Sequence, residues 1–87
     1  MTKLTDLELW SAIAGPDPAQ AWAELVNRHS KRVFALALHI LRSRTAAEDV
    51  VQETFVTAWE KRQRVDSPES LDKWLLKIAA FKALMAA

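Results

Sequence analysis

The sequence contains no cysteine, only one glycine and no long apolar run in its 87 residues. Without cysteine, a disulfide scaffold and a thiolate metal site are both excluded, and the composition fits a reducing compartment. The apolar runs are too short for a transmembrane helix, and Met1–Leu4 leads into charged residues rather than into a signal peptide. We therefore expect one small domain located in the cytoplasm.

The residue combinations needed for catalysis are also scarce. The chain has two histidines, His29 and His39, and the apolar pattern predicts both on one helix, about 15 Å apart along its axis. There is no glycine-rich phosphate loop and no histidine pair with the spacing of metal ligands. We expect each histidine to be hydrogen-bonded in place or solvent-facing, and we predict no enzyme activity, no metal site and no cofactor.

What the sequence does contain is helical periodicity. Apolar residues make up 51% of the chain and recur at spacings of three and four, and no segment alternates as a strand would. The prediction is an all-α, compact bundle of about four helices with short connections. The predicted elements are an N-terminal helix at 1–15, a second helix at 17–42, a third at 45–61, a loop at 62–70 and a final helix at 71–87.

Each predicted helix has a start signal. Thr5 with Glu8 and Thr45 with Glu48 have the spacing of capping boxes. The predicted caps of the other two helices are Asp17, followed by Pro18, and either Ser67 or Ser70. The apolar stripes then predict the inward-facing residues, which in the last helix are Leu71, Trp74, Leu75, Ile78, Phe81 and Met85.

Charge is segregated along the chain although the net charge is only +1. Residues 25–47 contain five Lys or Arg and no acid, whereas residues 45–60 contain four acids and no base. The acids lie on the exposed side of the third helix. A helix dipole favours acids in a first turn, which explains Glu48 and Asp49 but not Glu53 and Glu60. Two interpretations remain open, a solvated helix face and a docking site for a basic partner.

Basic residues follow this helix and return in the last one. Lys61, Arg62 and Arg64 precede the predicted loop, and Lys73 and Lys77 lie one turn apart on the final helix with Trp74 between them. Cations can contact phosphates and an aromatic ring can stack on an unpaired base. The alternative is an intrahelical pair of Glu69 with Lys73 and a core position for Trp74.

Two spaced motifs resemble a known family. Residues 47–59, AEDVVQETFVTAW, are similar to the region 2 helix of extracytoplasmic-function sigma factors of the sigma-70 family. Upstream, residues 25–37 resemble the preceding helix of that family, and residues 71–79, LDKWLLKIA, resemble its Trp-Leu-x-x-Ile-Ala stretch. Together these segments span about residues 22–81.

The resemblance implies particular partners and residue roles. The third helix would dock on the clamp helices of the largest catalytic subunit of core RNA polymerase. The loop would hold a flipped base of the non-template strand of the −10 promoter element, at a cost of a few kcal/mol for unstacking. The implied polymerase-binding residues are Asp49, Gln52, Glu53 and Trp59, and the implied DNA-binding residues are Lys61, Arg62, Arg64, Val65, Asp66, Ser67, Lys73 and Lys77.

The chain also departs from the family pattern. After Ala79 the family continues with polar residues, an acid and an arginine run, whereas this chain continues with AFKALMAA. The second sigma domain, which reads the −35 element, is expected to be absent from these 87 residues. Two hypotheses follow: a promoter-opening sigma domain, or a sigma-like interaction module that binds an anti-sigma factor or self-associates through its apolar end.

Overall fold

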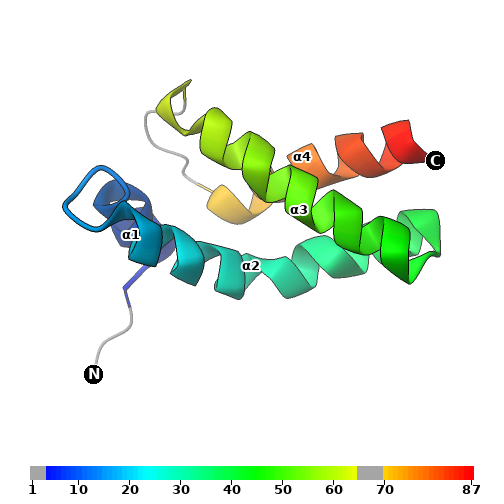
Figure 1. The fold of residues 1–87 in the computed structure, drawn as a ribbon, viewed down its shortest axis with the longest axis horizontal. Coiled ribbons are helices and arrows are strands. Elements are labelled where there is room, and N and C mark those ends of the chain that lie inside the picture. The colour runs from blue at the N-terminus through cyan, green and yellow to red at the C-terminus, as the bar shows by residue number, and fades with distance from the viewer. Residues whose placement is uncertain (1–3, 65–69) are drawn as a thin grey trace.

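The computed structural model describes residues 4–64 and 70–87, and these residues form helices without any strand. The all-α prediction is confirmed. In Figure 1, α2 and α3 form an antiparallel hairpin, α4 packs against both, and α1 lies beside the first half of α2. The elements are α1 (Asp6–Ala12), α2 (Pro18–Leu41), α3 (Arg44–Glu60), the single 3-10 turn η1 (Arg62–Arg64) and α4 (Leu71–Ala86).

Three helices begin where the sequence predicts. Thr5 and Glu8 form the reciprocal capping box of α1: the Thr5 hydroxyl accepts from the Glu8 amide at 3.1 Å, and the Glu8 carboxylate accepts from the Thr5 amide at 3.0 Å. Asp17 caps α2, with a proline at the first helical position, and Ser70 caps α4. These contacts satisfy amide groups that have no partner within a helix, so each fixes a start position.

The third helix begins earlier than predicted. Thr45 with Glu48 is not its capping box, because Ser43 is the N-cap and the helix starts at Arg44. Arg42 ends α2 in the left-handed conformation with φ 55°, so the chain re-enters a helix after a single extended residue. Glu48 instead forms an ion pair with Arg44 one turn before it, at 3.6 Å. The turn between α2 and α3 is therefore tighter than the sequence pattern suggested.

The remaining boundaries also shift. The first helix ends at Ala12 rather than near residue 15, and the segment predicted as a loop from Arg62 begins with the η1 turn. The rest of that segment, residues 65–69, lies outside the described residues.

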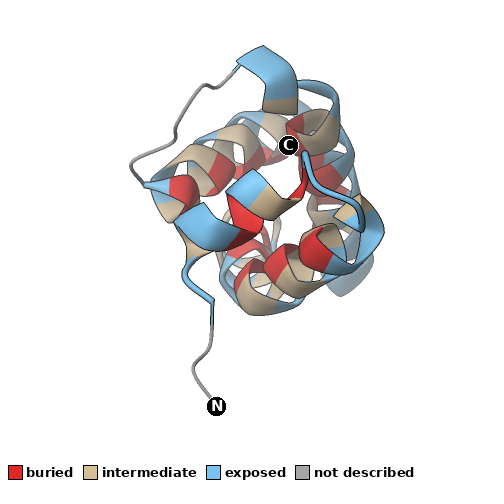
Figure 2. Cartoon of the chain, turned by 90° about the vertical axis from the view of Figure 1, so that its left-hand side faces the viewer, coloured by how far each residue is buried: buried red, intermediate tan, exposed pale blue. Residues whose placement is uncertain are grey.

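Alanines occupy much of the core. Ala37, Ala47, Ala58, Ala79 and Ala83 have no exposed surface. A side chain this small lets helix backbones approach closely, and a larger one would overpack the contact. Figure 2 shows the buried positions on the inner sides of the helices. In α2 and α4 they recur every four residues, at Ala21, Leu25, His29, Val33 and Ala37, and at Leu71, Leu75, Ala79 and Ala83.

Two residues predicted to face inward do not. Phe81 is 64% exposed and Met85 is 72% exposed. The buried positions of α4 end in Ala79 and Ala83, which place Phe81 and Met85 on the opposite side of that helix. The prediction favoured large apolar residues, but the small ones form the contact.

Candidate functional site

The outer face of α3 carries three of the predicted polymerase-binding residues. Asp49, Gln52 and Glu53 are all exposed and are spaced three and four apart, which places them on one side of the helix. Among the described residues, neither Asp49 nor Glu53 lies in an ion pair. We call Asp49, Gln52 and Glu53 the acidic face.

The shifted start of α3 changes the explanation for these acids. Because α3 begins at Arg44, its first turn contains no acidic residue, and Glu48 and Asp49 lie in the second turn. The helix dipole acts mainly within the first turn, so it does not account for either acid. The interpretation that assigned Glu48 and Asp49 to dipole stabilisation is therefore wrong.

A shallow groove adjoins the acidic face. It lies between α2 and α3, has a volume of about 370 Å³, and contains Gln52 on one wall and Phe34 on the other. The guanidinium of Arg44 lies 5.7 Å from the Phe34 ring centroid. The sequence pattern does not mark Phe34 as part of a site, because its half-burial depends on how α2 and α3 pair. The complete lining is Ser30, Lys31, Phe34, Glu48, Val51 and Gln52.

The fourth predicted polymerase-binding residue, Trp59, lies in an aromatic cluster. Its ring centroid is 5.1 Å from that of Trp22, which in turn lies 6.3 Å from that of Phe55. Trp59 is half-buried, and with Val56 it lines an apolar groove of about 490 Å³ beside α2. Val56 is 59% exposed and lies between the acidic face and Trp59 along the helix. The sequence does carry a signal for Val56, because it is an apolar residue on an otherwise polar helix face. The prediction of the polymerase-binding residues missed it.

The predicted DNA-binding residues fall into three groups. Lys61 and Arg64 are exposed at the end of α3 and in η1, and Lys73 and Lys77 are exposed on α4. Arg62 differs, because its guanidinium lies 3.7 Å from the centroid of the Trp59 ring. Val65, Asp66 and Ser67 lie outside the described residues.

Trp74 belongs to the packed interior rather than to an open surface. It is half-buried, and its ring meets Trp10 edge to face, with centroids 5.4 Å apart and planes at 84°. Such pairs contribute about 0.5–1.5 kcal/mol beyond their area burial. Trp74 therefore packs α4 against α1, which agrees with the alternative prediction of a core position for Trp74.

A polar network joins α1, α2 and α4 around His29. This side chain is 8% exposed, and each ring nitrogen faces a carboxylate: Nε2 lies 2.9 Å from Asp6, and Nδ1 lies 3.3 Å from Asp72. Arg28 pairs with Asp6 at 3.4 Å, and Arg32 pairs with Asp72. His29 is thus hydrogen-bonded in place, while His39 is exposed.

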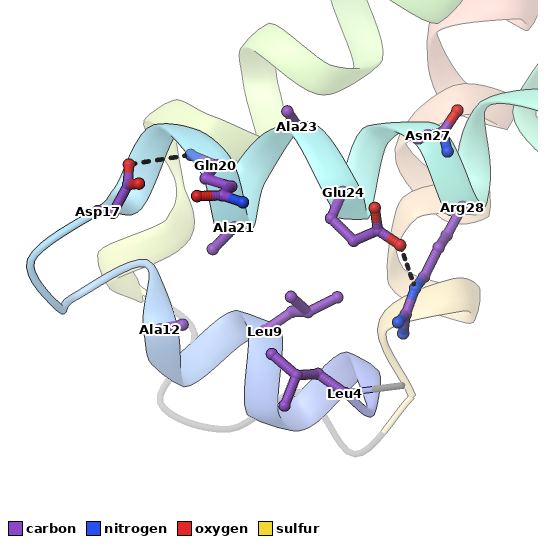
Figure 3. Close-up of a pocket in the computed structure, with 10 residues that line it drawn as sticks. All are labelled: Leu4, Leu9, Ala12, Asp17, Gln20, Ala21, Ala23, Glu24, Asn27 and Arg28. Carbon is purple, nitrogen blue, oxygen red and sulfur yellow. Dashed lines mark hydrogen bonds and ion pairs between the residues drawn. The ribbon is translucent and has the colours of Figure 1, made fainter. Parts of the chain in front are cut away.

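A third groove is lined by none of the predicted polymerase-binding residues. Figure 3 shows it between α1 and the first half of α2, with Leu4 and Leu9 on one side and Glu24 and Arg28 on the other. Its volume is about 840 Å³. Within residues 4–64 and 70–87, no group of three or more His, Asp or Glu is placed to hold a metal ion. In the same ranges, every helix is too short or too polar to cross a membrane.

Comparison with known proteins defines the class to which this arrangement belongs. The family model described as Sigma-70 region 2 matches residues 25–87, which include most of α2 and all of α3 and α4. The chain belongs to the Sigma-70 region 2 family. The resemblance inferred from the spaced motifs is confirmed.

Three relatives illustrate the range of similarity. The chain is 38% identical over 71 residues to the probable RNA polymerase sigma factor RfaY of Xanthomonas campestris pv. campestris, covering 82% of this chain and 17% of that protein. It is 36% identical over 58 residues to the ECF RNA polymerase sigma factor SigE of Mycolicibacterium smegmatis, covering 67% and 22%. It is 35% identical over 65 residues to the RNA polymerase sigma factor CarQ of Myxococcus xanthus, covering 74% and 37%.

The chain therefore spans well under half the length of these relatives. No solved structure gives a significant match to it.

Proposed function

We propose that this chain is the part of an extracytoplasmic-function sigma factor that binds core RNA polymerase and recognises and melts the −10 promoter element. The observation that carries the proposal is the acidic face. Asp49 and Glu53 repel each other across one helical turn, and neither is compensated by an ion pair within the described residues. A basic partner surface would supply the missing opposite charge. This role involves no covalent chemistry and locates the chain in the cytoplasm.

The polymerase contact extends beyond the acids in this proposal. Val56 and Trp59 continue the outer side of α3 and would contribute apolar area, since interfaces combine charged positions with desolvated apolar and aromatic ones. The clamp helices of the largest catalytic subunit are the proposed partner. Their basic residues would meet Asp49 and Glu53, and Gln52 would hydrogen-bond at the centre.

The promoter contact is proposed for the segment that follows. Lys61, Arg64, Lys73 and Lys77 are exposed cations that would contact the phosphates of the non-template strand. Residues 65–67 would contact the flipped base, as the family resemblance implies.

Binding to purified core RNA polymerase tests the docking proposal. Asp49→Ala and Glu53→Ala are each expected to weaken binding about tenfold, because each leaves a charge on the partner unpaired. The matched control is Glu24→Ala, which removes a partly exposed acid of α2 outside the acidic face and should leave affinity nearly unchanged. Unchanged affinity in both single variants and in the double variant would refute the docking proposal.

A second candidate function is a sigma-like interaction module without promoter activity. Phe81, Leu84 and Met85 favour it, because all three are at least 64% exposed on the last two turns of α4. This surface could bind an anti-sigma factor or a second copy of the chain. Fluorescence anisotropy with single-stranded −10 DNA separates the candidates. Binding with strong salt dependence supports the first, and absence of binding at low salt supports the second.

A further inference from the structure

Arg62 is engaged with the helix that precedes it. One terminal nitrogen of its guanidinium donates to the Trp59 carbonyl at 2.6 Å, and the guanidinium carbon lies 3.7 Å from the centroid of the Trp59 ring. The Trp59 carbonyl belongs to the last turn of α3, where carbonyl groups have no partner within the helix. A cation there is also favoured by the helix dipole. The same side chain therefore caps α3 and covers Trp59.

This contact fixes how the chain leaves α3. Arg62 is the first residue of η1, and the Arg64 amide closes that turn by donating to the Lys61 carbonyl at 2.9 Å. Trp59 is itself held against Trp22 of α2, with centroids 5.1 Å apart. Trp22 meets Trp59 edge to face and Arg62 lies over the Trp59 ring, so these three side chains connect α2 to the turn that carries Arg64.

We propose that Arg62 is a positioning residue: its guanidinium, stacked on Trp59 and bonded to the Trp59 carbonyl, holds η1 so that Lys61 and Arg64 face DNA. This inference rests on the proposed promoter-binding function and changes one assignment within it. Arg62 was predicted to contact DNA directly, but its planar face and a donor are already engaged. Lys61 and Arg64, by contrast, are exposed.

The geometry requires arginine. A guanidinium can stack its flat face on an indole while its edge donates to a carbonyl, whereas a lysine ammonium is a compact charge on a flexible stem. A phosphate contact, however, needs mainly the positive charge, which lysine retains. Substitution by lysine therefore distinguishes the two roles.

The experiment measures binding of the chain to a labelled pool of single-stranded DNA oligonucleotides at several salt concentrations. Arg62→Gln is expected to weaken binding about two- to fivefold, without changing the slope of log Kd against log salt concentration. Arg62→Lys is expected to be equally weak. The matched control is Arg64: Arg64→Gln should reduce the slope by about 0.7, the value for one phosphate contact on a single strand. Arg64→Lys should restore most of the affinity.

The indole N–H resonance of Trp59 reports the contact itself. It should shift in Arg62→Gln and in Arg62→Lys, but not in Arg64→Gln. A constant resonance in the Arg62 variants would overturn the inference.

Two DNA-binding results also overturn it. A reduced slope in Arg62→Gln with recovery in Arg62→Lys would make Arg62 a direct phosphate contact. Unchanged DNA affinity with a lowered melting temperature would make Arg62 a contributor to stability alone. If the unmodified chain does not bind DNA even at low salt, the proposed promoter contact itself fails.

Discussion

Asp6 and Asp72 differ from Asp49 and Glu53 in what surrounds them, although all four carry the same charge. Asp6 on α1 and Asp72 on α4 each face a nitrogen of His29, and each also pairs with an arginine of α2. Asp49 and Glu53 are exposed on α3 and, within the described residues, take part in no ion pair. Asp6 and Asp72 therefore join α1 and α4 to α2, whereas Asp49 and Glu53 repel each other across one turn of α3.

The difference separates acids that hold the fold from acids that are available to a partner. Removing a group from the His29 network leaves partly buried charges without their hydrogen bonds, which lowers the free energy of unfolding. Removing an acid from the acidic face relieves a repulsion and leaves the fold intact. Stability and binding should therefore respond in opposite ways in the two regions.

The largest stability effect is expected for His29→Ala. The substitution removes a buried ring and one partner from each of Asp6 and Asp72, which should lower the free energy of unfolding by about 2 kcal/mol. The matched control is His39→Ala, an exposed histidine on the same helix, for which we expect a change within about 0.5 kcal/mol. Urea unfolding measures both values.

Equal losses in the two histidine variants would contradict this view of the network. They would mean that the contacts from Asp6 and Asp72 to His29 add nothing beyond an ordinary helix position.

The sequence predicted the helices well because their signals are local. Thr5 with Glu8, Asp17 and Ser70 act within one turn of the chain, and all of them cap helices in the structure. The prediction of Thr45 as an N-cap was wrong because Ser43, two residues earlier, caps the same helix. Ser43 can cap α3 only because Arg42 adopts a left-handed conformation, and arginine has no intrinsic preference for that conformation.

The core and the charge pairs could not be predicted as well because they depend on distant residues. Arg32 lies in a segment without acids, yet it pairs with Asp72, 40 positions away. Arg28 pairs locally with Glu24 but also with Asp6, 22 positions away. Ala79 and Ala83, rather than Phe81 and Met85, meet the neighbouring helices. Both outcomes follow from how closely the helices approach, which periodicity alone does not specify.

The motif spacing, by contrast, was enough to identify the family. The polymerase and DNA contacts that the resemblance implies remain predictions, and among them the structure changes the interpretation of Arg62.

A smaller effect of opposite sign is expected on the acidic face. The double variant Asp49→Asn with Glu53→Gln removes a like-charge pair one turn apart and should raise the free energy of unfolding by about 0.2–0.5 kcal/mol. The control is Glu48→Gln, which breaks the exposed ion pair with Arg44 and should lower that free energy slightly. A clear loss of stability in the double variant would show that Asp49 and Glu53 stabilise the fold rather than being available to bind a partner.

The smallest effect concerns Glu8, an exposed acid that does have a local partner. Hydrogen bonds from the Thr5 backbone amide and side chain hold the pKa of Glu8 below its ordinary value of 4.5. A folded-state pKa below the unfolded value adds stability above pH 4.5, and this stability is lost as the pH falls through the lowered pKa. Glu8→Gln should therefore be less stable than the unmodified chain at neutral pH, and the gap should narrow on acidification.

Thermal unfolding from neutral to acidic pH checks this, with Glu53→Gln as the exposed control. Within the described residues Glu53 has no such hydrogen bond. We therefore expect no comparable pH-dependent difference in stability between Glu53→Gln and the unmodified chain. A Glu8→Gln gap that stays constant or widens as the pH falls would rule out a contribution from the ionised carboxylate. It would show instead that the Glu8 side chain supports the start of α1 independently of its charge.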